Sequence, residues 1–159
     1  MFLRFYRESK SAIEAKYLVF REEMTRIARN NGDVIIPKVI IRTPSETLTF
    51  ENVQVAPHHL RDDMYQKDHI TAIDTIMSLG EQNKISYDLQ WYESIGTAEI
   101  VKNYFVERIN KHKAQGRCGF VYEAGSEKFN CFRVNHIHIP SDIRGINSPE
   151  YVEYFWICI

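Results

Sequence analysis

Two histidines, His136 and His138, stand two residues apart in the stretch NHIHIP at residues 135–140. Side chains with this spacing on a β-strand point to the same face of the sheet. Two parallel imidazoles can offer two ligand nitrogens to one divalent transition metal. A metal held in this way activates a bound water for hydrolysis, so the pair is a candidate for half of a hydrolase site.

A metal site needs further ligands, and the second expected helix offers them. His58, Asp62, Tyr65 and His69 follow a four-three-four spacing and would share one helical face. Two or three of these side chains, together with the histidine pair, would give a shell suited to zinc, manganese or iron, for example in a phosphoesterase. The sequence contains neither HExxH nor CxxC, so surface histidines without a metal are the favoured interpretation.

The stretch VNHIHIPSDIRGINSPE also resembles the first half of the HNH nuclease motif. That family implies a second metal-binding histidine on a following helix. Asn135 stands where the family has a metal-binding aspartate, and residues 151–159 contain no histidine. Because such a site needs both ligands to hold its ion, we do not expect nuclease activity.

Composition and charge argue against several classes of partner. The chain has 20 Lys and Arg against 21 Asp and Glu, which gives a net charge of −1, and 44% of its residues are hydrophobic. Proteins that bind nucleic acid through its phosphates normally carry an excess of positive charge, so nucleic acid is not the expected partner. No apolar run is long enough to span a bilayer, and the N-terminus does not resemble a signal peptide, so we expect no membrane partner.

The cysteines give an expectation about the compartment. Cys118, Cys131 and Cys158 are odd in number and show no CxxC spacing. This pattern favours reduced thiols and a cytoplasmic location over a disulfide framework or a zinc site.

The hydrophobic patterns predict one α+β domain over residues 1–159, with a mainly antiparallel mixed sheet packed against about three helices, in the order βα-ββ-α-β-α-βββ. A change of alternation at Glu51 and Asn52 predicts a β-bulge. The expected helices follow Ser11, Pro57 and Thr97 and end near glycines 32, 80 and 116, with charged residues in the second helix leaving open two shorter ones. The expected strands are residues 34–42, 47–55, 85–91, a hairpin over 118–139, and 151–159.

The last of these strands is rich in aromatic residues. Tyr151, Tyr154, Phe155 and Trp156 lie in a segment with a single charge. If the strand is central, both of its faces are covered; if it lies at an edge, a partner must cover it, and Tyr and Trp are typical of such interfaces. The sequence leaves core and protein interface open.

The sequence contains no nucleophile elbow and no Gly-rich phosphate loop, so we expect no cofactor and favour a protein that is not an enzyme. The first hypothesis is a small cytoplasmic accessory protein that docks on another protein, as a homo-oligomer. Inhibitors of host enzymes from phages and mobile elements are proteins of this general type. The alternative is the metal-dependent hydrolase with His136 and His138 as ligands.

Overall fold

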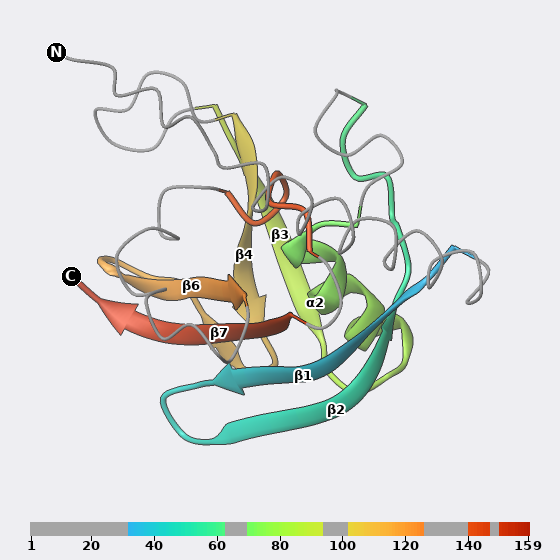
Figure 1. The fold of residues 1–159 in the computed structure, drawn as a ribbon. Coiled ribbons are helices and arrows are strands. Elements are labelled where there is room, and N and C mark those ends of the chain that lie inside the picture. Colours follow the sequence, from blue (N-terminus) through green and yellow to red (C-terminus); the bar gives the residue numbers. More distant parts are fainter. Residues whose placement is uncertain (1–31, 63–69, 94–101, 126–139, 147–149) are drawn as a thin grey trace, which may run out of the picture.

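The fold is seen in a computed structural model, which describes residues 32–62, 70–93, 102–125, 140–146 and 150–159 (Figure 1). Strands account for 54% of the structure and helix for 10%, and the strands form two sheets. The part of the chain that the structure describes is therefore nearly all-β, and the prediction of an α+β domain with about three helices is wrong. No helix among the described residues is long and apolar enough to cross a membrane.

The larger sheet has four strands in the order β2-β1-β7-β6. Strand β7 lies between β1 and β6 (Figure 1), parallel to the first and antiparallel to the second. Because both of its edges are paired, the backbone N–H and C=O groups of β7 are satisfied on each side, and its Val152 and Tyr154 are buried in the core. The strands are β1 (Val34–Arg42), β2 (Thr47–Val55), β6 (Cys118–Gly125) and β7 (Tyr151–Cys158).

The hairpin of β1 and β2 is kinked in both strands at the same level. Asn52 has a φ of 51° and stands opposite Pro37, which has no N–H to donate. Partners on the two sides of this point follow one unbroken register, from Ile36 with Val53 to Lys38 with Glu51. The alternation of buried and exposed residues changes phase at the point where the sequence predicted a bulge. It changes in both strands at once, so the register is kept and there is no bulge.

The smaller sheet contains β3 (Tyr87–Tyr92), β4 (Asn103–Ile109) and β5 (His112–Lys113). The helix predicted over residues 97–116 is wrong, because its described part forms β4 and β5. The buried residues of β4 are three apart, at Asn103, Val106 and Ile109, and this spacing imitates a helix. A β-bulge contributes to the spacing, since Val106 pairs with Leu89 and Arg108 with Asp88, which leaves Glu107 as an extra residue.

The described helix, α2 (Ala72–Glu81), occupies only the second half of the helix predicted from Pro57. Thr71 and Asp74 form its capping box, which fixes the helix start. Residues 56–62 are not helical, and His59 has a φ of 49°. One face of α2 packs into the core shared with both sheets, through Ile73, Ile76 and Leu79.

Several predicted elements lie outside the described residues. These are the strand that the predicted order places before the first helix, the helix beginning near Ser11 and the second arm of the hairpin that starts with β6.

Gly80 gives a test of how α2 packs against β3. A Cβ at this position would collide with the ring of Tyr87. We expect Gly80→Ala to lower the free energy of unfolding by about 1–3 kcal/mol, although alanine is the better helix former. In a Tyr87→Ala background the same change should stabilise by about 1 kcal/mol, and urea denaturation of the four proteins measures this coupling. Equal effects in both backgrounds would contradict the contact.

Candidate functional site

The structure does not bring the predicted metal ligands together within the residues that it describes. His69, His136 and His138 lie outside those residues. His58 and Asp62 do not share a helical face, because the segment that carries them is not a helix. Among the described side chains, no group of three His, Cys, Asp or Glu residues could hold a metal ion.

His58 instead lies between two carboxylates of α2. Its Nδ1 is 2.9 Å from Oδ1 of Asp74, to which it donates a hydrogen bond, and its Nε2 is 3.1 Å from Oε2 of Glu81. The His58 side chain is 9% exposed and that of Asp74 is fully buried. The bond to Asp74 raises the pKa of His58 above its ordinary value of 6.5, with a smaller contribution from Glu81 and against the effect of burial. This arrangement holds the segment after β2 on the helix.

A second buried ion pair lies beside the predicted ligand Asp62. Nη1 of Arg61 donates to Oδ2 of Asp142 at 2.9 Å, and both side chains are buried. Burial raises the pKa of Asp142, while the Tyr104 N–H and the Arg61 guanidinium oppose the rise. Arg61 also lies over the ring of Trp91, 5.4 Å from its centroid. Asp62 is exposed and borders a shallow hollow of about 440 Å³ with these aromatic side chains.

A larger hollow, which we call the groove, lies between the two sheets. It has a volume of about 620 Å³. One side is formed by the end of β3 and the middle of β4, the other by β6 and the end of β7, and the turn before β6 also contributes to the lining. Most of its lining is apolar, including Tyr92, Phe105, Phe120, Val121, Ile157 and Ile159.

Exposed apolar side chains gather at this groove. Tyr92 is 37% exposed and Ile159 is 82% exposed, and they are the only large hydrophobic residues in the described ranges that reach this level. Both line the groove, although its two sides come from distant parts of the sequence. Singly exposed hydrophobic residues are common on protein surfaces, and the notable feature here is that both of them lie at the same hollow.

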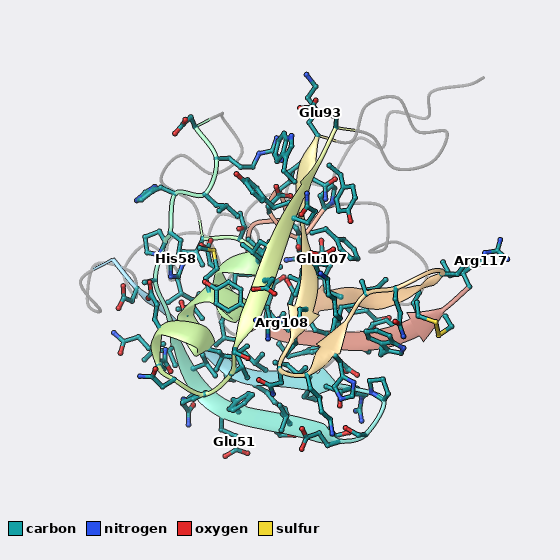
Figure 2. All side chains as sticks on the ribbon, turned by 180° about the vertical axis from the view of Figure 1, so that it is seen from behind. Glu51, His58, Glu93, Glu107, Arg108 and Arg117 are labelled. Atoms are coloured by element: carbon teal, nitrogen blue, oxygen red, sulfur yellow. A yellow bond between two sulfur atoms is a disulfide. The ribbon has the colours of Figure 1, made fainter. Side chains whose placement is uncertain are left out.

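The groove also has a positive and a negative side chain. The bulge in β4 places Glu107 in its lining, and Arg117 projects from the tip of β6 (Figure 2). The sheets approach closely below them: a Cβ on Gly119 would lie 3.3 Å from the Cβ of Ala114 and 3.7 Å from the ring of Phe105. Glycine at position 119 therefore chiefly leaves room for Ala114 in the turn before β6, while the Phe105 ring of β4 lies at ordinary contact distance.

A disulfide between Cys118 and Cys158 closes one end of the groove. The two cysteines are 40 residues apart and meet as cross-strand partners of β6 and β7. The expectation that the chain has only reduced thiols is therefore wrong for this pair, and Cys131 lies outside the described residues. Next to the disulfide, the N–H of Ile159 donates to the carbonyl oxygen of Arg117 at 3.0 Å.

The four aromatic residues predicted as a protein interface all lie on β7. Tyr154 is 2% exposed and belongs to the core, whereas Tyr151, Phe155 and Trp156 are half-buried. Trp156 packs edge-on against Phe120, with ring centroids 5.1 Å apart. Their role in binding a partner stays a prediction.

Sequence reasoning did not find this groove. The helix expected over residues 97–116 contains Phe105 and Glu107, and Tyr92 lies just beyond the strand expected over residues 85–91. The available signal was the pair of cysteines near the ends of two predicted strands, because antiparallel pairing of those strands brings Cys118 and Cys158 together.

Comparison with known proteins adds no relative: neither a protein-family model nor a curated protein matches the sequence. Interpretation of the groove therefore depends on its own chemistry.

The raised pKa of His58 predicts a pH dependence of stability. Because the folded pKa lies above 6.5, the stabilisation is fully present below that pH and is lost as the pH rises through the folded pKa. We expect the stability difference between the wild type and His58→Gln to be largest below pH 6.5 and to shrink as the pH rises above it. Urea denaturation at several pH values measures it, and a difference that stays constant would contradict the assignment.

The buried pair predicts a large cost for neutralising one partner. Asp142→Asn leaves the charge of Arg61 buried without its counterion, so we expect a loss of about 3 kcal/mol or more in the free energy of unfolding. Asp88→Asn is the matched control, because Asp88 pairs with Arg108 at the surface. Its effect should be much smaller, and similar losses in the two variants would show that burial does not set the cost.

Proposed function

We propose that this protein acts by docking on another protein through the groove between its two sheets, which we call the docking groove from here on. The observation that carries the proposal is the convergence of Tyr92 and Ile159, the most exposed large hydrophobic side chains described, on one hollow. Removing such side chains from water on binding provides a favourable free energy.

The shape and charge of the groove support a protein as the occupant. Its sides come from two sheets, so their spacing is fixed by the core and changes little on binding. Tyr92 supplies a large, amphipathic contact of the kind found in interface hot spots. Glu107 and Arg117 provide one charge of each sign in the lining, where they can orient a partner that carries complementary charges.

Other parts of the functional hypothesis stay predictions. A homo-oligomer, an inhibitor of a host enzyme and a cytoplasmic location all belong here, and sedimentation analysis tests the first. The expected cytoplasmic location and the disulfide point in different directions, because disulfides persist in oxidising compartments and are rare in the cytoplasm. The alternative metal-dependent hydrolase depends mainly on residues outside those described, and elemental analysis of the purified protein tests it.

Site-specific photocrosslinking tests the docking proposal. A benzoylphenylalanine at position 92 should form an adduct of one discrete mass with a protein from an extract of the source organism. The same amino acid at position 51 is the control, because Glu51 is exposed on β2 at the opposite edge of the larger sheet (Figure 2). We expect no adduct of that mass from the control position, because Glu51 is not part of the groove lining and a crosslinker there does not reach a partner bound in the groove.

A second variant links the adduct to the groove. Ile159→Glu places a charge at the apolar rim and should abolish the adduct formed from position 92. Because the side chain is 82% exposed, the substitution should change the free energy of unfolding by no more than about 0.5 kcal/mol. Equal adducts from positions 92 and 51, or an adduct that survives Ile159→Glu, would refute docking at this site.

A further inference from the structure

The Cys118–Cys158 disulfide is placed where its chemistry can act on the docking groove. Cys118 begins β6 and lines the groove, and Cys158 ends β7 and is exposed. A thiolate in solution can therefore approach the bond from the side of Cys158. Reactive disulfides are accessible in this way, whereas those buried in a core are inert.

The pairing of β6 with β7 has support that does not depend on this bond. The two strands match residue by residue from Gly119 with Ile157 to Gly125 with Tyr151. Their inward side chains fill the core along this length, with Phe120, Tyr122, Val152 and Tyr154 all at most 7% exposed. Opening the disulfide should therefore leave the sheet in place.

The rim of the groove depends on the bond more directly. Ile159 follows Cys158, and its described backbone contact is the hydrogen bond from its N–H to the Arg117 carbonyl oxygen. Arg117 in turn precedes Cys118. The disulfide thus holds together the two short segments that carry Ile159 and Arg117, and strand ends without such a tie fray.

We propose that this disulfide is a thiol–disulfide exchange site whose redox state controls the docking groove, an inference that rests on the proposed function. One thiolate of a dithiol reductant attacks Sγ of Cys158, the S–S bond breaks, and Cys118 leaves as a thiolate that takes up a proton. The second thiolate of the reductant then attacks the mixed disulfide and releases Cys158 as a thiol. The reductant becomes a cyclic disulfide, and two electrons have passed to the protein.

The consequence of reduction is local. The end of β7 separates from the turn before β6, Ile159 leaves the rim, and the groove loses its most exposed apolar contact. Reoxidation by a small disulfide such as oxidised glutathione restores the rim by the reverse exchange. In a reducing compartment the groove has a low affinity for its partner, and in an oxidising compartment it has a high affinity.

The test uses the full chain with Cys131→Ser, so that only this pair of cysteines reacts. Oxidised and reduced samples are titrated with the apolar dye anilinonaphthalene sulfonate, and Tyr92→Glu identifies dye that binds elsewhere. We expect about tenfold weaker dye binding at the groove after reduction, the factor associated with loss of one isoleucine contact. Alkylation in native buffer should label both cysteines after mild reduction, while the far-ultraviolet circular dichroism stays unchanged.

A variant that cannot form the bond provides the matched control. Cys118→Ser/Cys158→Ser should bind dye as the reduced protein does, whether or not reductant is present. If that variant does not fold, the comparison of oxidised with reduced protein still decides the matter.

Each remaining outcome has one meaning. Equal dye binding in the two redox states overturns redox control and leaves the docking proposal standing. Unfolding of the chain on reduction, or an intact mass that shows no disulfide, also overturns redox control. Oxidised protein that binds no dye sensitive to Tyr92→Glu overturns the docking proposal together with the inference that rests on it.

Discussion

The buried carboxylate of Asp74 is the constraint on which the arrangement of the core depends. Its Oδ2 accepts hydrogen bonds from the N–H and the hydroxyl of Thr71, and its Oδ1 accepts from the N–H and the imidazole of His58. A buried charge requires such partners. Beside it, Ala72 and Ile73 donate to carbonyl oxygens in residues 141–144. Three segments therefore meet at the first turn of α2, and their meeting positions the helix between the sheets.

The sequence predicts the elements whose pattern has a single physical cause. The alternation over residues 85–91 arises from one buried face, and it appears as β3. In β4 the alternation of a strand is interrupted by a bulge at Glu107. The buried residues are therefore three apart, a spacing that is also typical of a helix. The helix predicted from Pro57 begins instead after Thr71, because Asp74 binds the backbone of His58 outside the helix. Tertiary contacts override local pattern in both places.

The docking groove is hard to predict for the same reason. No segment contains it, since its lining comes from the ends of several strands and from a bulged residue. Phe105 faces it because β4 is a strand, and Gly119 leaves room for Ala114 in the turn before β6. A sequence reports the types of these residues but not the sheet order that brings them together. His58 and Asp62 show the opposite case. They are four residues apart, as on one face of a helix, but the segment that carries them is not helical, so the spacing does not bring them together.

The inner position of β7 has a consequence for how the chain is made. Glu153 of β7 and Arg42 of β1 are hydrogen-bonded across a separation of 111 residues. Closing so long a loop is entropically costly, and folds with many such pairings form slowly. During synthesis, β1 and β2 leave the ribosome long before β7, and the edge of β1 waits unpaired while the intervening residues are added. An unpaired apolar edge invites association with other chains, so this protein is most exposed to aggregation while it is still being synthesised.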